Sequence, residues 1–154
     1  MTAELAGQWT LVSGLSIFAR VNAKPPSAPS TPIVLVHGQV ISSLYMVPTA
    51  KLLAPVFRVF APDLPGFGLS DKPASVLSVP QLADALGMWM EVNALDRAVL
   101  VGNSLGCQIA VDLAVRRPDL AGCLVLSGPT IDPHARSALI QIARWLADWP
   151  GERP

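Results

Sequence analysis

Apolar positions along this chain fall into two kinds of run. Short continuous runs, rich in β-branched residues, cover residues 33–36, 58–61, 97–101 and 120–126. Such runs predict strands that are buried on both faces, as in a parallel sheet. Between and after them, residues 42–56, 78–95, 105–117 and 134–149 carry apolar positions at helical spacing. This alternation of strands and helices predicts an α/β fold.

The first part of the chain has a different pattern. Residues 8–14 and 15–21 are two β-prone runs that meet at Gly14, which predicts an antiparallel hairpin at a sheet edge. Residues 22–32 are rich in proline and predict a surface connection.

Local signals mark the helix ends. Ser78 before Pro80 predicts the start of one helix, and Arg116 with Arg117 before Pro118 predicts the end of another. Ser42 or Ser43 is a candidate cap for the helix in 42–56, in which Pro48 argues against a regular first half.

The order of the strands follows from the handedness of their connections. Right-handed crossovers from a central strand place helices on both faces of the sheet. Numbering the strands along the chain, we expect a doubly wound, mostly parallel sheet in the order 1-2-4-3-5-6. One antiparallel strand should lie at an edge, and the strand of residues 33–36 should lie between those of 58–61 and 97–101.

Composition narrows the classes of partner. Of 154 residues, 51% are hydrophobic and 14% charged, and the formal net charge is zero. A neutral chain gives no electrostatic reason to expect nucleic acid or a membrane as partner. No apolar run reaches the roughly 18 residues that cross a bilayer, and the N-terminus lacks the pattern of a signal peptide. Cys107 and Cys123 have no metal-type spacing and indicate buried thiols, so we expect a cytoplasmic protein without metal or cofactor.

The junction of a strand and a helix holds the strongest chemical signal. Gly102, Ser104 and Gly106 form the pattern G-x-S-x-G where the run 97–101 meets the helix of 105–117. A serine in such a tight strand-to-helix turn is exposed at the carboxyl end of the sheet, and the helix amides, starting with that of Leu105, can stabilise an oxyanion. The alternative is a chance pattern in a glycine-rich loop, which the strand–turn–helix context disfavours.

Two further motifs follow the preceding strands. They are His37–Gly38–Gln39, and the pattern D-x-x-G-x-G-x-S from Asp63 to Ser70. Together with G-x-S-x-G, they make residues 8 to about 130 resemble the α/β-hydrolase superfamily in its single-domain form with a lid.

The resemblance implies that Ser104 is the nucleophile and that the Gln39 amide is the second oxyanion donor beside Leu105. We therefore expect Ser104 to have a φ above zero or an otherwise strained backbone, with its hydroxyl pointing into a cleft below Gln39. It implies serine relatives rather than dehalogenases and epoxide hydrolases that use an aspartate. We also expect Asp63 to fix its glycine loop and Ser70 to cap a turn.

The catalytic base is the open question, because a serine needs a histidine within hydrogen-bond reach. His37 and His134 are the two histidines of the chain. The resemblance implies an acid and a histidine after strands seven and eight, which have no counterpart here, and it gives His37 a role in shaping the oxyanion loop. We expect His134 to be an exposed loop residue. Asp132 is a candidate acid, because a minority of the family carries the acid after strand six, although its setting also suits a plain turn.

The resemblance divides the chain into residues 1–130, the front part of a hydrolase core ending after the sixth strand, and residues 131–154, the start of a lid or cap. Three hypotheses remain open. The chain is a fragment of a serine hydrolase, a short inactive protein that binds a ligand or partner, or a binding module that was never an enzyme. An unpaired sixth strand would also offer an edge for self-association.

The substrate is expected to be a small hydrophobic molecule. Serine relatives include esterases, lactonases and hydrolases of carbon–carbon bonds, so the bond is an ester, a related acyl bond or a C–C bond. Trp145 and Trp149 in the last apolar run favour an apolar substrate, unless they pack on the core.

Overall fold

The computed structural model describes residues 3–27 and 30–129 of the chain. The expectations for the segment 131–154, which concern a lid helix, Asp132, His134, Trp145 and Trp149, lie outside the described residues.

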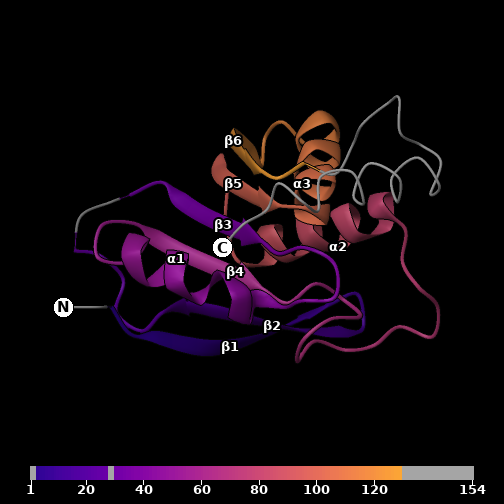
Figure 1. Cartoon of the computed structure of the whole chain (residues 1–154), viewed down its shortest axis with the longest axis horizontal. Helices are drawn as coiled ribbons and strands as arrows, with labels where there is room; N and C mark the ends of the chain where they lie inside the picture. Colours follow the sequence, from indigo (N-terminus) through magenta and orange to yellow (C-terminus); the bar gives the residue numbers. More distant parts are fainter. Residues whose placement is uncertain (1–2, 28–29, 130–154) are drawn as a thin grey trace, which may run out of the picture.

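The described residues form one six-stranded sheet in the order β1-β2-β4-β3-β5-β6. Its strands are β1 (Leu5–Val12), β2 (Leu15–Asn22), β3 (Pro32–Val36), β4 (Arg58–Pro62), β5 (Ala98–Asn103) and β6 (Ala121–Ser127) (Figure 1). β3 pairs in parallel with both β4 and β5, and β6 pairs in parallel with β5. The expected strand order, with residues 33–36 between 58–61 and 97–101, is confirmed.

The position of the reversed strand differs from the expectation. β2 is antiparallel to both of its neighbours, β1 and β4, so the reversed strand is second in the sheet and β1 takes the edge. The cause is the tight turn between β1 and β2, where Ser13 (φ 49°) and Gly14 (φ 83°) both have positive φ. Such a two-residue turn reverses the chain once more, so β1 runs in the direction of β4.

The helices are η1 (Ser43–Met46), a 3₁₀ turn, followed by α1 (Val47–Leu53), α2 (Val79–Val92) and α3 (Leu105–Arg116). Ser42 accepts a hydrogen bond from the N–H of Leu44 at the start of η1. Pro48 lies in the first turn of α1, where the missing N–H has no intrahelical partner to lose. At the start of α2, the Gln81 side chain accepts hydrogen bonds from the N–H and the hydroxyl of Ser78, as the sequence signal at Ser78 predicted.

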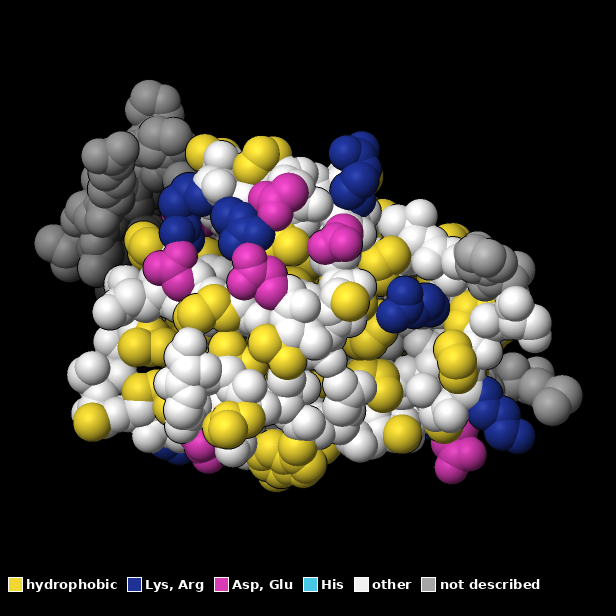
Figure 2. Space-filling view, turned by 180° about the vertical axis from the view of Figure 1, so that it is seen from behind, with side chains coloured by type: hydrophobic (Ala, Val, Ile, Leu, Met, Phe, Trp, Pro, Cys, Tyr) yellow, Lys and Arg dark blue, Asp and Glu magenta, His cyan; other side chains and the backbone are white. Residues whose placement is uncertain are grey.

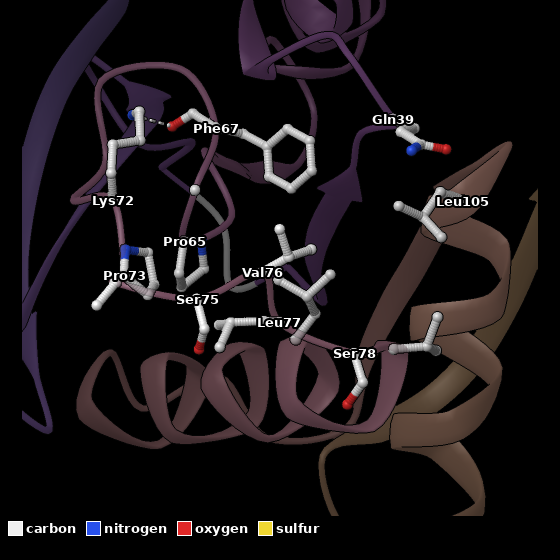
Figure 3. A pocket seen from close by; sticks show the side chains of 14 residues that line it. Gln39, Pro65, Phe67, Lys72, Pro73, Ser75, Val76, Leu77, Ser78 and Leu105 are labelled. Carbon is white, nitrogen blue, oxygen red and sulfur yellow. Dashed lines mark hydrogen bonds between the residues drawn. The ribbon is translucent and has the colours of Figure 1, made fainter.

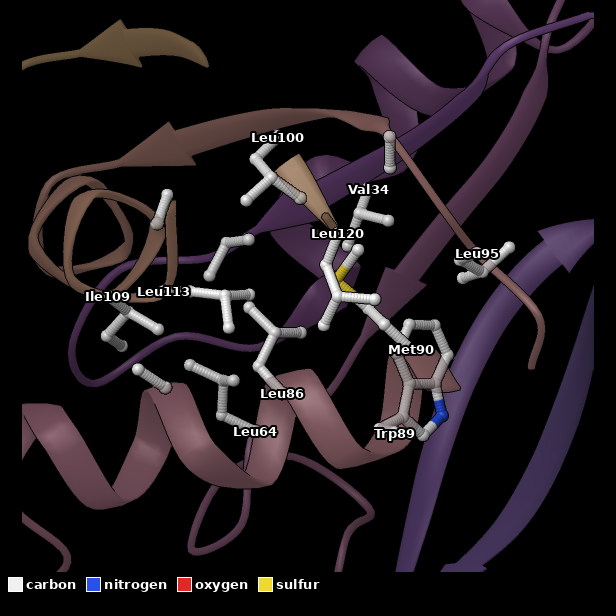
Figure 4. Close-up of a cluster of buried hydrophobic side chains, with 14 of the residues drawn as sticks. Val34, Leu64, Leu86, Trp89, Met90, Leu95, Leu100, Ile109, Leu113 and Leu120 are labelled. Atoms are coloured by element: carbon white, nitrogen blue, oxygen red, sulfur yellow. The ribbon is translucent and has the colours of Figure 1, made fainter. Parts of the chain in front are cut away.

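The two faces of the sheet carry separate apolar clusters. η1 and α1 cover β3 and β4 on one face, with Met46 of η1, Ala50 of α1 and Ala54 directly after α1 in the cluster. On the other face, α2 and α3 enclose the larger cluster, which Figure 4 shows; its fully buried members include Val34, Leu86, Trp89, Leu100, Ile109 and Leu113. The doubly wound arrangement is therefore present.

Ion pairs join α2 and α3 on their outer side. Arg116 binds Asp84 of α2 and Asp112 of α3. Arg117 binds Glu91 of α2 at 2.7 Å and Asp119 at 2.6 Å. Figure 2, seen from behind, shows basic and acidic side chains gathered next to one another over these helices. The arginines expected at the end of α3 therefore also bind the neighbouring helix.

Two expectations about burial were wrong. β6 was expected to be a buried strand, but Val125 is 48% exposed and Leu126 is 41% exposed. Cys123 on the same strand is exposed, whereas Cys107 on α3 is buried as expected. The reason is position: within residues 3–27 and 30–129, β6 pairs only with β5, so one edge of it has no partner. An apolar sequence alone does not distinguish a central strand from this one.

The packing of α3 against the larger apolar cluster can be tested by substitution. Leu113 on α3 is 1% exposed in the larger cluster, while Val115 on the same helix is 76% exposed. Leu113→Ala should lower the free energy of unfolding by about 2–5 kcal/mol, because it leaves a cavity. Val115→Ala should change it by no more than about 0.5 kcal/mol. Urea denaturation measures both, and equal effects of the two substitutions would contradict this assignment of the core.

Candidate active site

Ser104 occupies the sharp turn between β5 and α3. Its backbone angles are φ 52° and ψ −116°, a positive φ that a residue with a side chain rarely adopts. The expectation of a strained backbone at this serine is confirmed. A chance glycine pattern in an ordinary loop does not account for this conformation at a strand–helix junction.

The two glycines of the motif are required by close backbone contacts. A Cβ atom at Gly102 would lie 2.6 Å from the carbonyl oxygen of Gly106. A Cβ atom at Gly106 would lie 2.2 Å from the carbonyl oxygen of Val36, at the end of β3. Any side chain at either position would therefore push the start of α3 away from the sheet.

Hydrogen bonds hold this turn to the ends of two strands. The N–H of Ser104 donates to the carbonyl of Ser127 on β6 at 3.0 Å. The thiol of Cys107, in the first turn of α3, lies 3.2 Å from the carbonyl oxygen of Gly102 and 3.3 Å from that of Ser127. The buried thiol thus links the helix to β5 and β6.

Gln39 and Leu105 lie close to one another at a cavity of about 540 Å³. Figure 3 shows them together on one side of this cavity, with Lys72 and Pro73 on the other. The remaining lining is mainly apolar and comes from residues 65–67, 74–79 and Leu82. Ser104 is not among the lining residues, so the direction of its hydroxyl stays a prediction. Gly38, next to Gln39 in the chain, lies close to Ser104, since a Cβ atom at position 38 would lie 3.1 Å from the Cβ atom of Ser104.

His37 is fully buried, and both of its ring nitrogens are occupied. The N–H of Leu64 donates to Nε2 at 3.0 Å, so Nε2 is an acceptor and the ring proton lies on Nδ1. Nδ1 in turn donates to the carbonyl of Gly38 at 2.8 Å. This arrangement supports the expected role of His37 in shaping the oxyanion loop (residues 38–43) and leaves no nitrogen free to receive a proton from Ser104.

Burial also lowers the pKa of His37 below its ordinary value of 6.5. The hydrogen bond to Gly38 and the negative charge of Asp63 act in the opposite direction but are smaller effects. Desolvation and a hydrogen bond accepted from an N–H both stabilise the neutral form of an imidazole ring.

Asp63 is fully buried and holds the glycine loop (residues 63–70), as expected. Its Oδ2 accepts a hydrogen bond from the N–H of Leu69 at 2.7 Å. Gly68 has to be a glycine, because a Cβ atom there would lie 2.0 Å from the same oxygen. The other oxygen, Oδ1, accepts from the N–H of Ser43 at 2.7 Å.

Ser70 does not cap a turn of its own loop, contrary to the expectation. Its hydroxyl accepts from the N–H of Phe18 on β2 at 2.9 Å and donates to the carbonyl of Asp63 at 2.6 Å. It therefore joins the glycine loop to the hairpin. The reason is that β2 lies directly beside β4, which brings the hairpin within reach of the loop that follows β4.

Two residues near the site, Lys72 and Arg20, had no recognised role in the sequence, and Ser43 was considered only as a candidate helix cap. Lys72 donates to the carbonyls of Phe67 at 3.1 Å and Gly68 at 2.8 Å, and to that of Ser70, so its ammonium group closes the glycine loop. Arg20 on β2 donates to the hydroxyl of Ser43 and lies 3.9 Å from Oδ1 of Asp63. A basic residue two positions after the glycine motif is a signal that could have identified Lys72. No local signal identifies Arg20, and none indicates that Ser43 binds Asp63.

Within the described ranges, no group of three or more His, Cys, Asp or Glu side chains could hold a metal ion. None of the described helices is both long and apolar enough to cross a membrane.

The sequence profile of the α/β hydrolase fold family matches residues 31–152. The chain belongs to this family. Its sheet order, its strand–turn–helix at Ser104 and the motifs after β3 and β4 are consistent with that membership.

Known relatives are longer than this chain. A 2-(acetamidomethylene)succinate hydrolase from Mesorhizobium japonicum is 31% identical over 142 residues, which cover 90% of this chain and 51% of the relative. A haloalkane dehalogenase from Mycolicibacterium paratuberculosis is 37% identical over 119 residues, covering 75% of this chain and 40% of the relative. Among solved structures, a mutant of the N-acyl homoserine lactonase AidH complexed with N-hexanoyl homoserine has a TM-score of 0.73 and 26% identity, with coverage of 82% and 46%. The chain thus spans about half, or less, of the proteins it matches.

The buried ring of His37 makes the stability depend on pH. The unfolded chain titrates His37 near pH 6.5 and the folded chain titrates it lower, so the unfolded state binds more protons in between. The contribution of this group to the free energy of unfolding is therefore complete above about pH 6.5 and is lost as pH falls toward the folded pKa, with a slope of at most about 1.4 kcal/mol per pH unit. His37→Gln should flatten the profile measured by urea denaturation between pH 5 and 7.5.

His134→Gln is the matched control, because it removes a histidine but leaves the buried ring in place. A His37→Gln profile as steep as that of His134→Gln would contradict the assignment of a neutral buried ring to His37.

Proposed function

We propose that this chain carries the nucleophile and oxyanion site of a serine hydrolase that cleaves an ester, a related acyl bond or a C–C bond next to a carbonyl in a small hydrophobic molecule. The observation that carries the proposal is the strained backbone of Ser104 at the junction of β5 and α3. Ser104 is the nucleophile, and the N–H groups of Leu105 and Gln39 are the oxyanion donors.

The start of α3 supports this role of Leu105. The first N–H groups of a helix have no intrahelical acceptor and carry the positive end of the helix dipole. When the Ser104 oxygen attacks a carbonyl carbon, the electron pair of the carbonyl moves to its oxygen, which becomes an oxyanion. Donors that are already oriented toward this oxygen lower the barrier without reorganising. Collapse of the tetrahedral intermediate expels the leaving group, and water then cleaves the acyl-serine ester.

The proton of Ser104 has to go to a base other than His37, because both nitrogens of His37 are occupied. His134, and any histidine of a longer protein that contains this chain, are the remaining candidates. Asp132 is retained as a candidate acid. Asp132 and His134 are only two residues apart, so one would have difficulty orienting the other while both reach Ser104.

The cavity beside Gln39 and Leu105 supports an apolar substrate. Most of its lining is aliphatic, aromatic or proline, and its one charged residue, Lys72, donates to three backbone carbonyls of the glycine loop. The relatives are named for different substrates: an acetamidomethylene succinate, a haloalkane and an acyl homoserine lactone. The choice of an acyl substrate therefore rests on the serine at position 104.

One observation favours a second candidate function. Among the described residues His37 is the only histidine, and it is not available as a base. A chain with an intact oxyanion site and no base would bind a carbonyl or carboxylate ligand without turning it over.

The proposed function is tested by release of p-nitrophenol from short-chain p-nitrophenyl esters. The purified 154-residue chain should be little better than background, and Ser104→Ala should barely change it, because oxyanion stabilisation alone leaves only a small residual rate. In a longer protein that contains this chain and a later histidine, Ser104→Ala should lower kcat by at least about a thousandfold.

Ser75→Ala is the matched control, since Ser75 lines the same cavity and has no role in the chemistry. Robust hydrolysis by the 154-residue chain that is lost in both Ser104→Ala and His134→Ala would instead make His134 the base. Hydrolysis by the longer protein that survives Ser104→Ala would refute the nucleophile assignment.

A further inference from the structure

We propose that Asp63 is the positioning residue of the oxyanion loop and thereby fixes the Gln39 amide opposite that of Leu105. This inference rests on the proposed function, because it assigns Asp63 a part in the same site. It goes beyond the expected role of Asp63 in its own glycine loop.

The oxyanion loop is attached at both ends to two consecutive residues. Directly before the loop, the His37 ring accepts from the N–H of Leu64 at 3.0 Å. At the loop's end, the N–H of Ser43 donates to Oδ1 of Asp63 at 2.7 Å. Gln39 lies between these two attachments, so its position depends on both.

The same carboxylate also holds the wall of the cavity. Its second oxygen accepts from the N–H of Leu69, and Gly68 packs against it. The loop that contains these residues contributes Pro65, Gly66 and Phe67 to the cavity lining. One side chain therefore connects the oxyanion loop with the surface on which the substrate would lie.

Asp63 is itself held rigidly. It follows β4 directly, its N–H donates to the carbonyl of Phe18 at 2.8 Å, and its own carbonyl accepts from the hydroxyl of Ser70 at 2.6 Å. The Asp63 side chain is 1% exposed, and Arg20 lies 3.9 Å from Oδ1. A buried carboxylate with two N–H donors and a nearby guanidinium has little freedom to rotate.

The consequence for the reaction is geometric. Leu105 is fixed by α3, whereas Gln39 is on a loop, so the distance between the two donors depends on the attachment of that loop. A displacement of about 1 Å at a reacting centre can cost about a hundredfold in rate. Loss of the Asp63–Ser43 hydrogen bond should therefore lower kcat and leave KM nearly unchanged, because the oxyanion forms only in the transition state.

Ser43→Pro removes the N–H that Asp63 accepts, and Ser43→Ala is its matched control because it loses the hydroxyl and keeps the N–H. Proline is compatible with this backbone, since Ser43 begins η1 and Ser42 is extended (φ −133°, ψ −178°). In the 154-residue chain, Ser43→Pro should speed hydrogen exchange of the hydrogen-bonded amides at the two ends of the loop, those of Leu64 (bonded to His37) and Tyr45 (bonded to Ser42), at least about tenfold relative to Ser43→Ala.

A second pair of variants covers the case in which Ser43→Pro does not fold. Asp63→Asn keeps one acceptor oxygen, so either Ser43 or Leu69 loses its partner. Asp71→Asn is its control, because Asp71 accepts from the N–H of Ser16 on the hairpin and does not contact the oxyanion loop. Asp63→Asn should speed exchange of the amides of Leu64 and Tyr45, or of the amide of Leu69, and Asp71→Asn should leave all three unchanged.

The kinetic measurement uses a longer protein that contains this chain and a later histidine. There, Ser43→Pro should lower kcat about a hundredfold relative to Ser43→Ala, with KM within about threefold. Unchanged exchange in folded Ser43→Pro and Asp63→Asn, or faster exchange with unchanged kcat, would overturn the role of Asp63. If no protein containing this chain hydrolyses an ester, the proposed function fails, and the exchange experiment alone still decides whether Asp63 holds the loop.

Discussion

The close approach of α3 to the ends of β3 and β5 is the constraint on which the site depends. At Gly106 the backbone of the helix comes so near to β3 that a Cβ atom would lie 2.2 Å from the carbonyl oxygen of Val36. This approach brings the first amides of α3 to the same edge of the sheet as the loop after β3. It also forces the chain to turn within a single residue, which explains the positive φ of Ser104. Strain at one residue is thus the consequence of placing a helix N-terminus beside a strand end.

Around this contact, buried polar groups bind the loops at the carboxyl edge to one another, in addition to the apolar packing of Leu64 and Phe67. His37, Asp63 and Ser70 are each nearly or fully buried, and each binds backbone groups of a segment distant in sequence. Buried polar groups are costly unless they are satisfied, so such a network is stable only when every loop is in place. The hairpin takes part through Phe18 and Arg20, which gives β2 a role in the site although it contributes no residue to the cavity.

Much of this arrangement could be predicted from the sequence, and the failures have a common cause. The positions of the strands and the turn at Ser104 follow from local patterns, namely continuous apolar runs and glycines at fixed spacing. The strand order also needs the handedness of the crossovers, and the loop function of Asp63 was expected with the resemblance to the family. The exposure of β6, the second bond of Asp63 to Ser43 and the link from Ser70 to Phe18 depend on which elements are neighbours in space. Val125 on β6 and Leu100 on β5 have equally apolar settings in sequence, yet one is 48% exposed and the other is fully buried. The pattern of apolar residues cannot predict this difference in exposure, because the exposure depends on whether another element packs beside the strand.

The proposed chemistry divides into two parts that differ in what they require from the fold. Oxyanion stabilisation needs backbone amides at fixed positions, and a strand end, a helix start and two attached loops are sufficient to provide them. Proton transfer needs one side chain that reaches Ser104 with a free nitrogen. His37 does not meet this requirement, although it stands directly before the loop that carries Gln39. Its Nε2 accepts from Leu64, and its Nδ1 donates to Gly38. Releasing Nε2 to serve as a base would break the bond to Leu64, and releasing Nδ1 would break the bond to Gly38 at the start of the oxyanion loop. A histidine cannot fix the oxyanion donors and accept the serine proton at once, so within this architecture the two tasks belong to different residues.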